Sequence, residues 1–399
     1  MIALLKRLTA VSALLFGTIA QADPVEISGY VGVELNYFPQ TGLYPGQLMD
    51  TQSSLVFAPE LRWVSNDGDT RVNISAFGRL DADDNDRSHF DLREAFVQRY
   101  FGNFDALVGV NKVFWGVTES RHLVDIINQA DQLEYTDANS RLGQPMIAVS
   151  TDQDWGSLTG YIMTGFRELQ YPGDQGRLRF GLPVDTDATT WGDSAENLAP
   201  DYALRYFNTF GAVDLGLSAF HGTSREPILT PNSGGTALDP YYGRIWQAGI
   251  DVQYTGDAIL LKLETIVRGS EDFDTFAAAV AGIEYTVYQV AQSDSDLGII
   301  GEFLFDDRGA NAPPTIFQND VFAGLRWAAN DTQDTSLLVG AVFDLDDGST
   351  VIRGEFERRL EIGASLKIQA QAFTNLDPAN PFHGFRRDNF VSIGLERHF

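Results

Sequence analysis

The sequence predicts an all-β fold, a single transmembrane up-and-down antiparallel β-barrel of about 18 strands, with about 16 as the lower count. It also predicts a loop that folds inward and contains a short helix. Three observations support this interpretation. Apolar and polar residues alternate with a period of two along most of the chain. Short connections alternate with long ones, and the last run ends on an aromatic residue, Phe399.

The strands follow from the alternation, which is clearest near the start of the chain. Val31 and Val33 share one face of the first run, and Glu34 lies on the other. The later runs keep this pattern. The expected strands, in order, are 26–37, 54–63, 71–80, 90–100, 104–115, 146–151, 157–166, 202–208, 213–221, 246–254, 258–268, 275–290, 297–305, 321–327, 335–345, 352–358, 362–373 and 389–399.

The connections come in two lengths. The tight turn at 66–69 and the pair 102–103 are short, whereas 167–200 and 222–243 are long loops. Short turns at one end and long loops at the other are typical of bacterial outer-membrane barrels. A β-sandwich would not require this alternation, and no repeat of about 40 residues supports a propeller.

The two ends of the chain suggest export. Lys6 and Arg7 precede an apolar stretch, 8–20, and a small-residue cleavage site at 20–22, which predicts a signal peptide over 1–22 and a barrel over 23–399. The stretch is shorter than the ~20 apolar residues that span a bilayer, although a retained anchor is the alternative. The amphipathic last strand resembles the signal that outer-membrane assembly machinery reads, although a soluble barrel could also end in this way.

Composition excludes several classes of function. The formal net charge is −27, which argues against nucleic acid as a partner and against binding an anionic surface through a basic patch. The chain has no Cys, so disulfides, thiolate metal sites and a lipoprotein anchor are excluded. An exported, aromatic-rich chain of this kind is either a soluble β protein or a transmembrane barrel of the Gram-negative outer membrane, in contact with lipid and lipopolysaccharide.

The strand number decides which face points inward. Side chains cannot fill a barrel of about 18 strands, so the polar face is expected to line an aqueous lumen and the apolar face to meet lipid. Glu264 and Glu302 belong to this polar face. The residues expected to form the pore wall are Arg62, Arg79, Arg93, Arg99, Asn111, Arg205 and Arg326.

The segment 113–144 breaks the alternation. Leu123, Ile126 and Ile127 recur at helical spacing, which predicts a short amphipathic helix. A long ordered loop between two strands is often functional, so we expect it to fold inward and narrow the lumen, with an ordinary surface loop as the alternative. The residues expected at this constriction are Trp115, Glu119, Arg121, His122, Asp125, Asn128, Asp131 and Arg141.

An acidic run at 81–86 has the carboxylate density of a Ca²⁺ site. Its four aspartates are Asp81, Asp83, Asp84 and Asp86. The run lacks the Gly and the final Glu of an EF-hand, so a solvated acidic loop is the alternative. No other metal site and no cofactor are expected.

Several motifs resemble a family of proteobacterial outer-membrane proteins, long filed as a domain of unknown function and close to the alginate-export porins. They are LREAFV at 92–97, VGVNKVFWG at 108–116, LVDIINQADQLEY at 123–135, RLGQPMIAV at 141–149 and a second block at 202–227. The chain departs from the family at Asn111-Lys112, where Arg-Gln is usual, and at Gln129, where Pro is usual. The resemblance implies uptake of hydrophobic compounds such as lipids, sterols or aromatics, and it implies no catalytic residues.

Three functions are compatible with these features. The first is a porin-like channel for passive uptake of small solutes, for which hydrophobic compounds are what the resemblance implies. The second is a non-conducting structural or adhesive barrel, and the third is an outer-membrane lipid hydrolase. None of the five His residues lies in a G-x-S-x-G or H-E-x-x-H motif, so no enzyme is expected.

Overall fold

A computed structural model describes residues 25–135, 140–361 and 363–399. The signal peptide expected over 1–22 lies outside these residues. The strands that build the main sheet are β1 (Glu26–Tyr37), β2 (Thr51–Val64), β3 (Thr70–Asp81), β4 (His89–Phe101), β5 (Phe104–Asn111), β6 (Gln144–Gln153), β7 (Gly156–Met163), β9 (Asp201–Phe210), β10 (Val213–Thr223), β13 (Arg244–Thr255), β14 (Ile259–Ser270), β15 (Phe276–Val287), β16 (Asp296–Asp306), β17 (Asn319–Ala328), β18 (Ser336–Asp344), β19 (Thr350–Leu360), β20 (Ala364–Thr374) and β21 (Phe390–His398).

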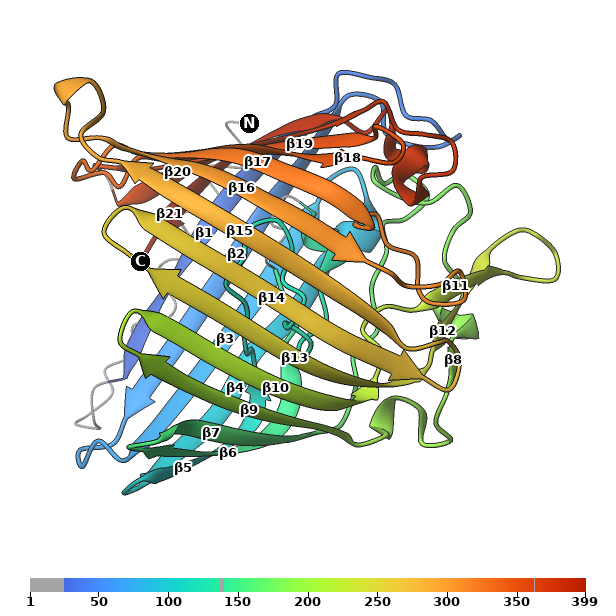
Figure 1. Ribbon diagram of the computed structural model, residues 1–399. Helices are drawn as coiled ribbons and strands as arrows, with labels where there is room; N and C mark the ends of the chain where they lie inside the picture. Colours follow the sequence, from blue (N-terminus) through green and yellow to red (C-terminus); the bar gives the residue numbers. More distant parts are fainter. Residues whose placement is uncertain (1–24, 136–139, 362) are drawn as a thin grey trace, which may run out of the picture.

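The main sheet closes on itself. Across the described residues its 18 strands all pair antiparallel with their neighbours, and β1 pairs with both β2 and β21. Val33, for example, lies opposite Leu55 on one side and Leu395 on the other. Closure leaves no open sheet edge, so the backbone groups of each strand find partners within the wall. The predicted antiparallel barrel of about 18 strands is confirmed (Figure 1).

The two ends of the barrel differ as the sequence predicts. Short turns such as 102–103 and 211–212 lie at one end, together with the start of β1 and the end of β21. The long connections lie at the other end, on the right in Figure 1. They carry a small second sheet of β8 (Thr190–Trp191), β11 (Ile228–Pro231) and β12 (Leu238–Tyr242), in segments that the sequence pattern predicted to be loops.

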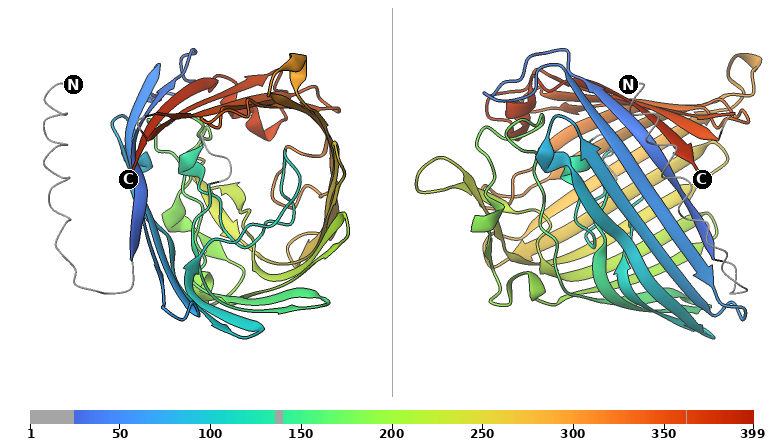
Figure 2. Two further views of the ribbon diagram at one scale, coloured as in Figure 1. Left: turned by 90° about the vertical axis from the view of Figure 1, so that its left-hand side faces the viewer. Right: turned by 180° about the vertical axis from the view of Figure 1, so that it is seen from behind.

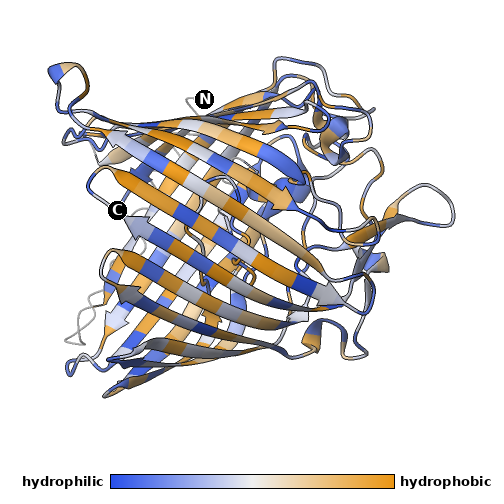
Figure 3. Cartoon of the chain, in the orientation of Figure 1, coloured by the Kyte–Doolittle hydropathy of each residue, from blue (hydrophilic) through white to orange (hydrophobic). Residues whose placement is uncertain are grey.

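Apolar side chains cover the outside of the wall. Along β14, Leu261, Leu263 and Val267 are exposed on the outer surface, while Glu264 and Arg268 are buried on the inner side. Hydrophilic and hydrophobic residues accordingly alternate along the strands in Figure 3. A folded chain that exposes so many large apolar side chains in a continuous band has the surface of a barrel in lipid.

Helical structure is scarce. The short turns of 3-10 helix are η1 (Asn85–Arg87), η2 (Gln132–Glu134), η3 (Thr186–Ala188), η4 (Glu196–Leu198), η5 (Val290–Gln292) and η6 (Pro381–Phe385). None of the helices among the described residues is long and apolar enough to cross a membrane. The expected short helix of the inward loop is a single turn, η2. The residues from Leu123 to Ala130, whose spacing suggested an amphipathic helix, have irregular backbone instead.

Strand β5 is shorter than predicted, and β4 contains an irregularity. β5 ends at Asn111 rather than near Trp115, because the chain turns away from the wall there. In the register between β3 and β4, Ser75 lies opposite Glu94 and Ala76 lies opposite Leu92. Arg93, between Leu92 and Glu94, therefore has no partner in the ladder. A β-bulge of this kind shifts the alternation of the strand by one residue.

The outer face can be tested at the middle of β14. Arg in place of Leu263 would place a charge in lipid and lower the free energy of unfolding by about 2–4 kcal/mol. Urea titration of the protein refolded in lipid vesicles, followed by tryptophan fluorescence, measures this change. Gln369→Arg on β20, which lines the lumen, is the control and should be near neutral. Equal losses in both variants would contradict the assignment of the two faces.

Candidate functional site

The connection between β5 and β6, of which the structure describes residues 112–135 and 140–143, is called the inner loop below. It leaves the wall after Asn111, passes through the lumen and returns at Gln144 (Figure 2, left). Its first part contacts β13, β14, β16 and β17, and its last part contacts β1 to β4. The prediction that this segment folds inward is therefore confirmed.

Glu264 of β14 holds the inner loop through its backbone. Its carboxylate accepts hydrogen bonds from the N–H groups of Val117 (2.7 Å), Thr118 (3.0 Å) and Val124 (3.2 Å). The Thr118 hydroxyl donates a further bond of 2.7 Å to the same carboxylate. Bonds to an ionised acceptor are stronger than those between neutral groups. The wall thus supplies the partners that these amides would otherwise find in a helix.

Glu302 of β16 repeats the arrangement two strands away. Its carboxylate accepts the N–H groups of Glu119 at 2.7 Å and of Ser120 at 2.8 Å. The Glu119 side chain in turn pairs with Arg326 of β17, which also lies 3.3 Å from Glu284. Two carboxylates on neighbouring parts of the wall therefore fix the path of the loop, and this explains why helical spacing alone did not produce a helix.

An apolar core lies between the inner loop and this part of the wall. The loop contributes five buried side chains to this core, Trp115, Leu123, Val124, Ile126 and Ile127. The wall contributes inward-facing apolar residues, among them Ile245, Ile266, Val280, Ile300 and Leu304. Burial of a side chain of this size stabilises by roughly 1.5–3 kcal/mol. One side of the lumen is consequently filled rather than aqueous, which the alternation pattern did not predict.

Asn128 joins the two ends of the inner loop. Its side-chain amide donates to the carbonyls of Asn111 and Leu142, both at 2.9 Å, and its oxygen accepts the N–H of Val113 at 2.8 Å. These three bonds replace the strand pairing that would have continued β5. Asn128 therefore positions the loop at its neck, and its buried side chain has no free polar atom to offer a solute.

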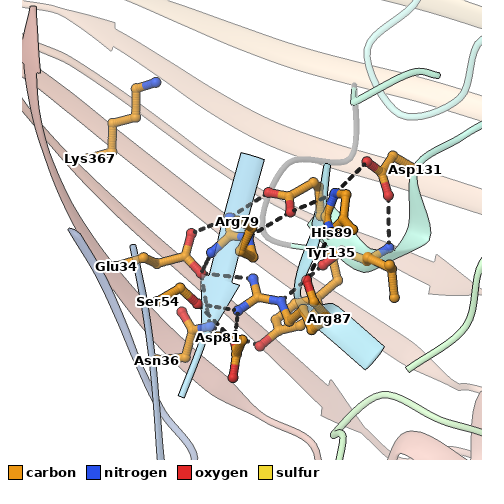
Figure 4. A network of polar contacts seen from close by, with 12 residues as sticks. Glu34, Asn36, Ser54, Arg79, Asp81, Arg87, His89, Asp131, Tyr135 and Lys367 are labelled. Atoms are coloured by element: carbon orange, nitrogen blue, oxygen red, sulfur yellow. Dashed lines mark hydrogen bonds and ion pairs between the residues drawn. The ribbon is translucent and has the colours of Figure 1, made fainter. Parts of the chain in front are cut away.

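The last part of the inner loop is tied to β1 and β3 by a charged network (Figure 4). Arg79 binds both Glu134 of the loop and Glu34 of β1. Arg87 binds Glu34 at 2.8 Å and Asp81 at 3.0 Å. These groups are nearly fully buried, and such a network holds only when each charge keeps its partners.

Asp131 is the second link on this side. Its carboxylate pairs with Arg93 of β4, lies 3.6 Å from His89 and accepts the N–H of Leu133. Burial alone would raise the pKa of Asp131, but the bonds to His89 and Arg93 lower it to about 2. His89, Asp131 and Glu134 have the spacing of metal ligands among the described residues. Arginines already neutralise both carboxylates, so the cluster does not fit a cation.

The residues expected at the constriction are spread along the inner loop and do not form one ring. Trp115 packs on Tyr161 and Arg205, Arg121 pairs with Asp306 at 3.1 Å, and His122 lies 3.7 Å from Glu264. The structure brings Asp125 and Arg141 together, at 3.1 Å. Three members of the set line cavities: Glu119 and Arg141 line one cavity, and Asp131 lines a second.

Most residues expected on the pore wall face the lumen, each with a carboxylate or a backbone partner. Arg79 and Arg93 hold the inner loop, as described above. Arg205 pairs with Asp251, and Arg62 pairs with Glu60 at 2.8 Å. The remaining two are Arg326, which binds Glu119 and Glu284, and Asn111, whose carbonyl accepts from Asn128.

Arg99 does not face the lumen. It shares the outer face of β4 with Val97 and Phe101, lies over the ring of Phe101 and donates to the Thr70 hydroxyl at 2.6 Å. The bulge at Arg93 explains the difference, because it shifts the alternation in the second half of the strand. The sequence-based assignment of Arg99 to the pore wall was wrong.

The acidic run is partly built into the barrel. Asp81 accepts from Arg87, from Ser54 at 2.8 Å and from the backbone N–H groups of Asp83 and Asp84. Asp84 caps the turn η1 by accepting the N–H of Asp86. Asp81 is thus occupied by protein donors, and the four aspartates do not converge on one point.

Sequence reasoning missed a second charged cluster on the filled side. Glu226, in the connection after β10, accepts from Arg268 at 2.9 Å and from Arg308 at 3.0 Å. Arg308 also pairs with Asp306, the partner of Arg121. Arg268 of β14 and Asp306 at the end of β16 lie on alternating runs, whereas no periodicity marks Glu226 and Arg308. The loss of alternation in 276–283, where both faces are apolar, was the available signal for the filled half.

Two cavities lie on the opposite, polar side of the inner loop. One of about 750 Å³ is lined by β1 to β4 and β17 to β21, and includes Lys367, Gln369 and Arg326. The other, of about 1120 Å³, lies among the long connections. Both cavities are lined by Glu134 and Ser140, so they meet at the edge of the inner loop.

No protein-family model matches this chain, and no curated protein matches it in sequence. In structure it is similar to OccAB1 of Acinetobacter baumannii, with a TM-score of 0.57 and 9% identity over 94% of this chain and 96% of that one. Other similar structures are the outer membrane protein OmpT of Vibrio cholerae (TM-score 0.46, 10% identity, 96% and 100% covered) and a mutant of the Rh. blastica porin (0.44, 13%, 94% and 100%). The likeness to OccAB1 supports a shared barrel fold.

The role of Glu264 can be tested by Glu264→Ala. Removal of this carboxylate leaves three backbone N–H groups without their acceptor, and it should lower the free energy of unfolding by on the order of 3 kcal/mol. Trypsin should then cleave after Arg121 much faster than in the unaltered protein. Glu355→Ala on β19, where the carboxylate pairs with Arg353 of its own strand, is the control. Unchanged cleavage in Glu264→Ala would show that the carboxylate does not hold the loop.

The depressed pKa of Asp131 predicts a pH dependence. Because the pKa falls from its ordinary value near 3.8 to about 2 on folding, the ionised carboxylate stabilises the protein above about pH 4. This contribution is lost as the pH falls toward about 2. The difference in unfolding free energy between the unaltered protein and Asp131→Asn should therefore shrink over this interval. A difference that stays constant over this interval would contradict the assignment.

Proposed function

We propose that this protein is a porin-like channel of the Gram-negative outer membrane, through which small solutes diffuse passively. The observation that carries the proposal is the pair of cavities that meet at Glu134 and Ser140 inside a closed barrel. An apolar outer face and a polar passage in the middle are what a water-filled pore through lipid requires.

The passage lies to one side of the lumen. The inner loop and its apolar core occupy the side of β5 to β16, whereas the cavity of about 750 Å³ is bounded by β17 to β21 and β1 to β4. Its lining carries charges of both signs, including Arg326, Lys367, Glu355 and Glu396. Opposed charges across a narrow passage select solutes by size and dipole.

The proposed location in the outer membrane implies several partners for the barrel. The outer face would contact lipid and lipopolysaccharide, and the strand that ends at Phe399 would be read by the assembly machinery after removal of a signal peptide. Membership of the family near the alginate-export porins, and uptake of hydrophobic compounds, are supported by the motifs at 92–97 and 123–135.

Two variants at neighbouring positions of β20 test whether solutes pass through the cavity beside this strand. Gln369 lines the cavity, whereas Ile368 lies next to it on the outer face, opposite Ile393. Gln369→Trp should lower single-channel conductance in planar bilayers at least about twofold, because the indole fills space in the passage. Ile368→Trp is the matched control and should conduct normally.

Two results would contradict the proposal. An unaltered protein that inserts into bilayers without conducting would favour a structural or adhesive barrel. A Gln369→Trp variant with normal conductance would show that solutes do not pass beside β20.

A further inference from the structure

The larger cavity, called the outer vestibule below, lies at the long-loop end of the barrel. Its volume is about 1120 Å³, enough for a drug-sized solute. Four separate connections and the inner loop contribute to its lining. A solute that enters from this end must pass it before it reaches Glu134 and Ser140.

Aromatic rings form one wall of the outer vestibule. Tyr171 lies 6.2 Å from Phe180, which lies 5.7 Å from Phe385, and Phe382 lies 5.3 Å from Phe385, all measured between ring centroids. All four residues line the cavity. Connected ring faces offer an apolar surface and also the negative face that attracts a cation.

Carboxylates that lack a cationic partner line the same cavity. Asp84, Asp86 and Asp174 all contribute to the lining, and none of them forms an ion pair within the described part of the chain. Asp84 is only 2% exposed, and its Oδ2 atom has no hydrogen-bond partner there. Buried carboxylates are normally paired, so this atom indicates a partner that the described part of the chain does not supply.

Two glycines, Gly173 and Gly176, pack closely against the carboxylates of Asp84 and Asp86. A Cβ atom added at Gly176 would lie 2.5 Å from its Oδ2, and one added at Gly173 would lie 2.0 Å from Oδ2 of Asp86. The two glycines therefore let the loop lie against both carboxylates. Burial raises the pKa of Asp84, and the nearby charges of Asp86 and Asp81 raise it further. A bound cation would relieve this repulsion.

The other two carboxylates of the described lining are already neutralised. Asp131 pairs with Arg93, and Glu134 pairs with Arg79. Arg179 is the basic residue among the lining side chains described, and its guanidinium donates to the carbonyls of Asp174, Phe180 and Pro45. The three carboxylates of Asp84, Asp86 and Asp174 therefore outnumber this one cation. The outer vestibule thus combines aromatic faces with uncompensated negative charge.

We propose that the outer vestibule binds organic cations with an aromatic or apolar body, such as arylalkylammonium ions, before they enter the passage. This inference rests on the proposed channel function, and it names the class of solute that the channel favours. The ring wall would hold the body of the solute, while Asp86 and Asp174 attract its cationic group and the field of Asp84 adds to theirs.

Three probes separate the contribution of the positive charge to binding from the contribution of the aromatic ring. Benzyltrimethylammonium carries both, benzenesulfonate carries the ring with the opposite charge, and tetramethylammonium carries the charge alone. Each is added to the long-loop side of the full-length protein in a planar bilayer, and the concentration that halves the KCl current is measured. Benzyltrimethylammonium should block at a concentration about tenfold lower than either of the other two, since a cation–π contact plus an ionic attraction amounts to at least that factor.

Variants assign the effect to the outer vestibule. The double variant Asp86→Asn/Asp174→Asn should lose most of the preference for benzyltrimethylammonium, and Phe382→Ala should weaken its block without changing that of tetramethylammonium. Asp257→Asn/Asp294→Asn, which removes the same charge from exposed positions at the short-turn end, is the matched control and should behave like the unaltered protein.

The outcomes distinguish a failure of this inference from a failure of the proposed channel function. Equal block by benzyltrimethylammonium and benzenesulfonate, or a preference that survives the Asp86 and Asp174 substitutions, would overturn the inference while leaving the channel intact. Block that Ca²⁺ alone reproduces, with no role for Phe382, would also overturn it and assign the carboxylates to an inorganic ion. A protein that carries no KCl current would refute the proposed function instead. Calorimetric titration of benzyltrimethylammonium in detergent would then still test binding, and no heat of binding would overturn the inference.

Discussion

Closure of the sheet is the constraint on which the rest of the structure depends. Once β1 pairs with both β2 and β21, every strand has two neighbours and no edge remains. The outer face can then be uniformly apolar, because no backbone group is left to face lipid. The inside of such a wide cylinder cannot be packed by the wall alone, so it must hold water, an inserted segment or both.

The lumen of this barrel holds an inserted segment on one side and open space on the other. The inner loop packs apolar residues against β13 to β17, where the wall turns apolar residues such as Ile266 and Val280 inward. Carboxylates of the wall secure the loop by its backbone, and guanidinium groups of β3 and β4 secure its far end by its side chains. The side of β17 to β21 and β1 to β4 keeps the cavity of about 750 Å³ with its polar lining.

Much of the fold could be predicted from the sequence. The period of two shows which face of a strand is apolar, and the alternation of short and long connections indicates an up-and-down topology. The number and order of the strands, the outward apolar face and the inward course of the segment 113–144 were predicted correctly. The amphipathic helix expected from the spacing of Leu123 to Ala130 does not form, and the short helix of the loop is η2 instead. Glu264 and Glu302 lie more than a hundred residues away in sequence, and nothing local shows that they accept the loop amides. Arg99 was misplaced because a bulge leaves no mark in the residue pattern.

In the proposed channel, solutes pass on the polar side of the inner loop and not through its apolar side. The chain contains no cysteine, so single cysteines report on each side without background. Gln369→Cys faces the passage and Val280→Cys lies under the inner loop. A charged, water-soluble methanethiosulfonate reagent should reduce the bilayer current of Gln369→Cys and leave that of Val280→Cys unchanged. Loss of current in Val280→Cys alone would contradict this account.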